Sequence, residues 1–176
     1  MIRRVLFVAA AIVTSTTLVA EPVSADPISA EQTFVSRINS VRSAYGVRPL
    51  HVDPTLTSVA RDWAYKMALD GHISHRRDLS IGAPQTWMFL GENVGQGWEA
   101  HSLHDAFAAS QTHLANLVHP RFDSVGVGVV MVGSTMFVAQ EFMQSGYPVV
   151  TKAKKLRKCQ TRRCRRARAR YRASLA

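Results

Sequence analysis

The sequence predicts an α+β domain in which helices pack against an antiparallel sheet, and two observations support this fold class. Residues 29–45 and 54–70 place apolar side chains at helical spacing. Residues 124–132 are rich in valine, and together with residues 135–142 they flank a Gly-Ser turn pair, which is the pattern of a β-hairpin. Because the helices precede the strands without βαβ alternation, the order argues against a parallel sheet.

Two amphipathic helices are expected first. Ser29 and Gln32 have the spacing of a capping box, and Gly46 can supply a left-handed stop. Asp53-Pro54 is a suitable cap and first-turn pair for the second helix, which is expected to stop at Gly71. The apolar stripes of both helices predict core packing. They comprise Phe34, Ile38, Val41 and Tyr45, and then Leu56, Val59, Ala60, Trp63, Ala64, Met67 and Ala68.

Residues 72–100 are expected to form a long irregular segment, since four glycines and a proline lie among polar residues. Long loops in compact domains often carry function. A third helix is expected from near Ser102. A short fourth helix is expected from His113 to Val118, ending before Pro120.

The net charge of the chain, +10, is unevenly distributed. Residues 26–151 hold eight basic and eleven acidic side chains, whereas residues 152–176 hold twelve basic side chains and no acid. The sequence therefore predicts a domain over residues 26–151 and a basic C-terminal tail that is disordered on its own. Both cysteines, Cys159 and Cys164, lie in this tail, so the core of the domain is expected to form without a disulfide.

The basic tail is expected to bind a polyanion, either an anionic cell-envelope polymer or a membrane surface. Its single aromatic residue, Tyr171, provides no stacking platform for bases, so nucleic acid is not the expected partner. A solvated tail without a dedicated partner is the alternative.

Residues 1–25 show the three parts of a secretory signal: a basic start, an apolar run and a small-residue cleavage site that ends at Ala25. A cut after Ala20 is a second option. An uncleaved membrane anchor is the alternative, but the apolar run is short for a spanning helix and is interrupted by Thr and Ser. The domain is therefore expected outside the cell, with the tail as a means of retention at the envelope.

Seven histidines suggest a metal site, yet the chain lacks a HExxH helix and a CxxC pair. A more specific signal is the order of five short motifs: MALDGHISH at 67–75, GENV at 91–94, SQTHLANLV at 110–118, FDSVGVGV at 122–129 and FVAQEF at 137–142. Over about residues 31–144 this order resembles the CAP superfamily of cysteine-rich secretory, antigen 5 and pathogenesis-related proteins. It is most similar to the cysteine-free bacterial SCP-like branch.

The resemblance implies a three-layer α-β-α sandwich with a central antiparallel sheet and a cleft lined by two histidines and two acids. By motif, the two histidines correspond to His75 and His113, and one of the two acids corresponds to Glu92. Ser110 stands where the resemblance implies the second acid, so the set of four is incomplete. In several members of the superfamily the histidine pair binds zinc or another divalent cation, and His75, His113 and Glu92 are the corresponding metal-ligand candidates here.

Two functions are compatible with these residues. The first is an extracellular module whose cleft binds a small ligand, a lipid or a wall fragment. The alternative is a metal-assisted hydrolase, peptidase-like or acting on the wall, in which His75, His113 and Glu92 hold Zn²⁺ and activate a water molecule. The missing acid at Ser110 favours binding over catalysis. A third interpretation is that the same three residues form a hydrogen-bonded cluster with a purely structural role.

Three further polar residues in the motifs are expected to have structural roles. Asn93 is expected to brace its loop, Asn116 to anchor the short helix, and Glu141 to form a salt bridge on a strand beside the site.

Overall fold

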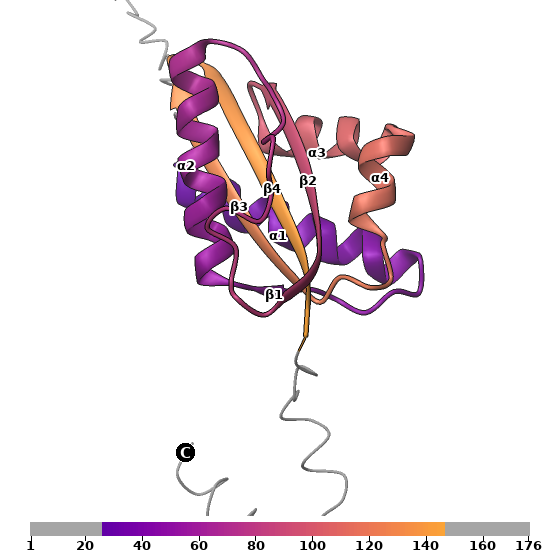
Figure 1. Ribbon diagram of the computed structural model, residues 1–176. Coiled ribbons are helices and arrows are strands. Elements are labelled where there is room, and N and C mark those ends of the chain that lie inside the picture. Colours follow the sequence, from indigo (N-terminus) through magenta and orange to yellow (C-terminus); the bar gives the residue numbers. More distant parts are fainter. Residues whose placement is uncertain (1–25, 147–176) are drawn as a thin grey trace, which may run out of the picture.

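The computed structural model describes residues 26–146, which form four helices and a four-stranded sheet (Figure 1). The expected signal segment at 1–25 and the basic tail at 152–176, with both its cysteines, lie outside the described residues. The elements in order are α1 (Pro27–Ala44), β1 (His51–Val52), α2 (Pro54–Asp70), β2 (Trp87–Gly97), α3 (Ala100–Ala109), α4 (Gln111–Leu117), β3 (Ser124–Val132) and β4 (Thr135–Ser145).

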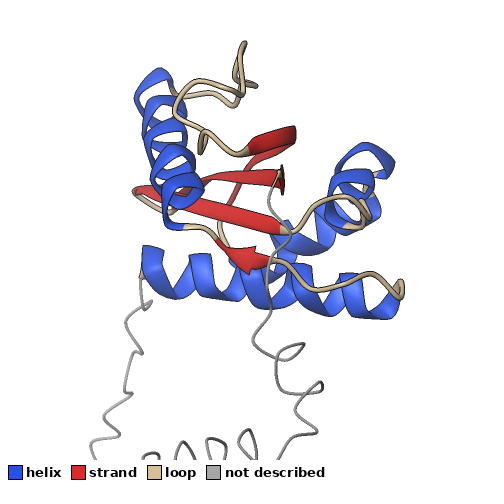
Figure 2. Ribbon diagram, turned by 60° about the horizontal axis from the view of Figure 1, so that its bottom comes forward, coloured by secondary structure: helices blue, strands red, loops and turns tan. Residues whose placement is uncertain are grey.

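The sheet lies between two helical layers. Its strand order is β1-β3-β4-β2, and β2, β3 and β4 pair antiparallel. Figure 2 shows α2 on one side of the sheet and α1, α3 and α4 on the other. The predicted α+β class and three-layer α-β-α sandwich are therefore confirmed, with one local difference: the two-residue strand β1 pairs parallel to β3.

The start of α1 differs from the prediction. The N-cap is Asp26, whose carboxylate accepts from the backbone N–H of Ser29 at 3.2 Å, and Pro27 opens the helix. The prediction of a capping box at Ser29 is therefore wrong, because Asp26 caps the helix and Pro27 begins it earlier in the chain. The predicted ends of the first two helices are confirmed. Gly46 and Gly71 have φ values of 69° and 72°, in the left-handed region.

Strand β2 overturns the expectation that residues 72–100 are irregular throughout. Two glycines of this strand, Gly91 and Gly95, lie where an aromatic ring contacts the backbone. A Cβ on Gly91 would lie 2.7 Å from Phe122 Cζ, and one on Gly95 would lie 2.7 Å from Phe107 Cζ. These glycines therefore make room for the core in a strand, where the sequence alone suggested loop flexibility.

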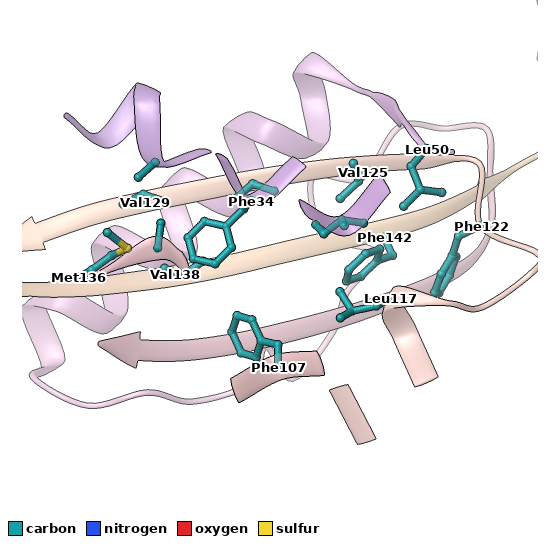
Figure 3. Packing of buried hydrophobic residues seen from close by; sticks show 14 residues of the cluster. Phe34, Leu50, Phe107, Leu117, Phe122, Val125, Val129, Met136, Val138 and Phe142 are labelled. Atoms are coloured by element: carbon teal, nitrogen blue, oxygen red, sulfur yellow. The ribbon is translucent and has the colours of Figure 1, made fainter. Parts of the chain in front are cut away.

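The larger part of the core lies between the sheet and the layer of α1, α3 and α4 (Figure 3). Phe122 is at one end of it, stacked on Phe142 with ring centroids 5.5 Å apart. Phe34 and Ile38 of the predicted first stripe are fully buried, whereas Tyr45 is 59% exposed, so its predicted place in the core is wrong. A smaller cluster under α2 contains Ala60, Met67, Val94, Phe137 and Ala139.

Helix α2 rests directly on the backbone of β3. A Cβ on Gly126 would lie 2.1 Å from the carbonyl carbon of Leu56, and one on Gly128 would lie 2.2 Å from that of Ala60. Since the nearest atoms belong to the helix backbone, no side-chain rotation can make room. The two glycines therefore set the separation between α2 and the sheet.

Arg42 is completely buried and binds only backbone carbonyls. Its guanidinium donates to the carbonyl oxygens of Arg48 at 2.7 Å, Leu117 at 2.9 Å, His119 at 3.1 Å and Phe122 at 3.2 Å. Leu117 is the last residue of α4, where unpaired carbonyls carry partial negative charge. The arginine thus joins the end of α1 to the segment that connects α4 with β3.

His104 of α3 makes stability sensitive to acid. The side chain is 1% exposed, both ring nitrogens lack a partner within residues 26–146, and burial lowers the pKa of His104 to about 4. An unfolded histidine has a pKa of about 6.5. Below that pH the unfolded chain takes up a proton that the folded chain excludes, so stability falls as the pH drops from about 6.5 to 4.

We expect His104 to cost about 2.5 kcal/mol of unfolding free energy at about pH 4.5 relative to about pH 7.5. Urea unfolding at both pH values measures this cost. His104→Phe should reduce the acid-induced loss by that amount. An identical acid dependence in the wild type and His104→Phe would contradict the assignment.

Candidate functional site

His75 and Glu92 lie together, as the motifs predicted. His75 follows α2 in the loop that leads to β2, and its Nδ1 is 2.6 Å from Glu92 Oε1. The backbone N–H of Arg76 donates to the same oxygen at 3.1 Å. The side chain of His75 is 62% exposed, whereas that of Glu92 is 2% exposed. The contact with Glu92 therefore fixes the orientation of an otherwise exposed imidazole.

Glu141 supplies a second carboxyl group to this site. It lies directly opposite Glu92 in the pairing of β2 with β4. Arg76 Nη1 is 3.2 Å from Glu141 Oε1, so the salt bridge expected for Glu141 is present. Sequence reasoning missed the proximity of the two acids, because it depends on the register of a strand that the sequence did not predict.

The environment of Glu141 favours its neutral form. Burial, and then the neighbouring charge of Glu92, raise the pKa of Glu141 to about 8, although Arg76 acts in the opposite direction. A neutral Glu141 reduces the repulsion between the two facing carboxyl groups. The guanidinium of Arg76 lies against the same pair and acts in the opposite direction on the pKa of Glu141.

His113 lies near this set without a hydrogen bond to it. Its ring is 5.0 Å from that of Phe107, and Nδ1 is buried without a partner in the described chain. Burial, and then the charge of His75, lower the pKa of His113, so the two imidazoles are within electrostatic reach. Ser110 ends α3, and its Oγ is 3.1 Å from Thr112 Oγ1.

The expected metal ligands do not fit a three-ligand centre. Within residues 26–146 no set of three His, Cys, Asp or Glu side chains is arranged to hold a metal ion. Glu92 Oε1 is occupied by two donors, and Oε2 is enclosed. His113 makes no hydrogen bond to this carboxylate within the described residues.

Two asparagines hold α4 against β2. Asn116 Nδ2 donates to the carbonyl oxygen of Glu92 at 3.0 Å and to Asn93 Oδ1 at 2.9 Å. Asn93 Nδ2 donates in turn to the carbonyl oxygen of His113 at 3.2 Å. Both asparagines thus have the structural roles expected of them, although Asn93 braces a strand where a loop was predicted.

A groove of about 810 Å³ opens between α2 and the loop that follows it, and His75 and Arg76 belong to its lining. Trp63 Nε1 donates to the carbonyl oxygen of Ser74 at 2.8 Å and fixes one wall. Val59 and Trp63 were expected in the core. Both line this groove and are half-buried, and Trp63 also packs against the smaller core cluster under α2. The full lining is Val59, Asp62, Trp63, Lys66, Ser74, His75, Arg76, Arg77, Asp78, Ile81 and Gly82.

A three-layer sandwich with a His–Glu pair at an open groove is the arrangement of CAP-type domains. The chain belongs to the cysteine-rich secretory protein family, CAP, whose sequence profile matches residues 35–142. A curated relative is the protein YkwD of Bacillus subtilis (strain 168), which is 30% identical over an alignment 113 residues long. The match covers 59% of this chain and 44% of YkwD. The chain thus spans less than half the length of that relative.

Solved structures share the fold at low sequence identity. An outer surface protein from Borrelia burgdorferi has a TM-score of 0.61 and 20% identity, over 66% of this chain and 92% of that protein. An extracellular protein containing an SCP domain from Bacillus anthracis str. Ames has a TM-score of 0.60 and 21% identity, over 68% of this chain and 41% of that protein. The structure of NaASP2 with Zn²⁺ has a TM-score of 0.51 and 14% identity, over 67% of this chain and 84% of that protein.

Proposed function

We propose that this chain is an exported CAP module that binds a small ligand, a lipid or a wall fragment in the groove beside His75. The observation that carries the proposal is the groove itself. Its volume of about 810 Å³ lies within the usual range of ligand pockets, about 300–1,000 Å³. The signal pattern at residues 1–25 and the extracellular and outer-surface descriptions of two structural relatives support export.

The lining favours an amphipathic ligand. Val59, Trp63 and Ile81 offer apolar surface. The charged part of the lining is mixed, with Asp62 and Asp78 as well as Lys66, Arg76 and Arg77. His75 adds a polar ring to the same lining, with Nδ1 engaged by Glu92. Such a combination suits a molecule with an apolar body and a polar head.

The hydrolase alternative receives no support from a particular contact. It needs His75, His113 and Glu92 to act on one ion, and the described residues contain no such three-ligand arrangement. A metal ion is therefore not part of the proposed function. In this proposal Glu92 positions His75 and Glu141 positions Arg76 at the groove.

Trp63→Ala is expected to weaken binding in the groove by about tenfold, because it removes the largest apolar wall. Fluorescence titration with a fluorescent fatty acid measures this affinity, and native mass spectrometry of the exported protein identifies a co-purified ligand. Tyr65→Ala is the matched control, since Tyr65 is also on α2 but is 58% exposed and outside the groove. Equal affinities for the two variants would refute the groove as the binding site.

A further inference from the structure

Helix α2 contributes two charged side chains to the lining of the groove, those of Asp62 and Lys66. Lys66 lies one helical turn from Asp62 and one turn from Asp70, so its spacing suits a pair with either acid. The structure pairs it with Asp70, since Lys66 Nζ is 2.5 Å from Asp70 Oδ2. The side chain of Asp62 is exposed and makes no hydrogen bond or ion pair within residues 26–146. Its carboxylate is therefore available to a ligand.

The loop that faces α2 contributes three charged side chains to the lining, and two of them have partners. Arg76 Nη1 is 3.2 Å from Glu141 Oε1. Asp78 Oδ1 accepts from the backbone N–H of Ser80 at 2.9 Å and from the hydroxyl of the same residue at 2.6 Å. The third side chain, that of Arg77, is exposed and has no partner in the described part of the chain. Its guanidinium is therefore available to an anionic group.

Two unpaired charges of opposite sign thus line one groove, Asp62 on the helix wall and Arg77 on the loop wall. A ligand that covers an ion without pairing it removes that ion from water without compensation, which is unfavourable. A ligand with a single charge leaves one of the two ions in this position. A head with one anionic group and one ammonium group pairs with both, and a planar guanidinium suits two oxygens of the anionic group.

We propose that the groove selects amphiphiles with a zwitterionic head, in which Arg77 binds the anionic group and Asp62 binds the ammonium group. This inference rests on the proposed function, because it assigns a ligand class to the same groove. The apolar chain of such a molecule lies against Val59, Trp63 and Ile81. A fatty acid or an alkylammonium ion offers only one of the two charges, so each is expected to bind less tightly.

Three probes that carry the same fluorescent label on the alkyl chain test this selectivity. They are a zwitterionic lysophosphatidylethanolamine, a fatty acid and an alkylammonium ion. Fluorescence titration of the exported chain gives a dissociation constant for each probe. The wild type should bind the zwitterionic probe about tenfold more tightly than either of the others, because it forms one additional ion pair. Equal affinities of the wild type for the three probes would overturn the proposal.

Two substitutions that remove a charge separate the roles of the two side chains. Asp62→Asn should weaken binding of the zwitterionic and alkylammonium probes about tenfold, without weakening binding of the fatty acid. Arg77→Gln should weaken binding of the zwitterionic probe and the fatty acid about tenfold, without weakening binding of the alkylammonium ion. Asp105→Asn and Arg48→Gln are the matched controls, because they change the net charge equally at exposed positions outside the groove lining. Thermal unfolding verifies that each variant is folded before titration.

The two proposals can fail separately. If the probes bind and Trp63→Ala weakens their binding, but Asp62→Asn and Arg77→Gln retain the order of affinities of the wild type, only the zwitterionic ligand class is overturned. The same conclusion holds if the two control variants change the order of affinities as much as the groove variants do. If no probe binds, or if Trp63→Ala binds every probe as tightly as Tyr65→Ala does, the groove is not the binding site and both proposals are overturned.

Discussion

Gly128→Ala is expected to destabilise the fold by about 3 kcal/mol or more, and to prevent accumulation of the folded protein if the chain is only marginally stable. The added methyl group would meet the carbonyl carbon of Ala60 at 2.2 Å and the amide nitrogen of Arg61 at 2.2 Å. Because both atoms belong to the backbone of α2, the whole helix must move away from the sheet. Urea unfolding followed by circular dichroism measures the change.

Gly97→Ala is the control for this prediction. Gly97 is also in a strand, but the nearest atom to its added Cβ would be Leu103 Cβ at 3.4 Å, an ordinary contact. We expect its unfolding free energy to change by less than about 1 kcal/mol. Similar losses in the two variants would mean that the close approach of α2 to β3 is not the cause.

Displacement of α2 should also affect the groove. Val59 and Trp63 lie on this helix, close in sequence to Ala60 and Arg61, and form part of the groove lining. Any Gly128→Ala protein that remains folded should therefore bind the fluorescent fatty acid less tightly than Gly97→Ala. The glycine is thus expected to influence binding through the position of the helix.

Arg42→Met is the second change with a large expected effect, a loss of about 4 kcal/mol in unfolding free energy. Methionine approximates the apolar stem of arginine but leaves four carbonyl oxygens without their donor, those of Arg48, Leu117, His119 and Phe122. Buried carbonyls without a partner each carry a desolvation cost. Thermal and urea unfolding of the purified protein measure the loss.

Two further variants make the interpretation of Arg42 specific. Arg42→Lys keeps the charge but replaces a planar group with five donors by a single ammonium, so at least half of the loss should remain. Arg48→Met removes an exposed arginine nearby and should change stability by less than about 0.5 kcal/mol. Full stability in Arg42→Lys would show that charge, and not the pattern of donors, matters.

Features that depend on neighbouring residues in the chain were predictable from sequence. Asp53 caps α2 through hydrogen bonds to the N–H groups of Thr55 and Leu56, and Gly71 ends the helix in the left-handed region. The hairpin of β3 and β4 was also predicted with nearly correct bounds. In each case the signal lies within a few residues of the feature.

Features that depend on distant partners were not predictable in the same way. Gly91 and Gly95 are required by the rings of Phe122 and Phe107, so local composition suggested a loop where the structure has β2. The predicted pairing of His75 with Glu92 came from motif order, whereas Glu141 was recognised only as a structural residue. Its place opposite Glu92 follows from strand register, which composition does not encode.

The hydrogen bond from Asn116 to the carbonyl oxygen of Glu92 also bears on how the protein behaves at high concentration. β2 is an edge strand of the sheet, and edge strands expose backbone groups that can pair with a second chain and start aggregation. Here an amide side chain from α4 takes up one of those groups at 3.0 Å. The helix that carries His113 thereby also hinders sheet extension at the middle of β2.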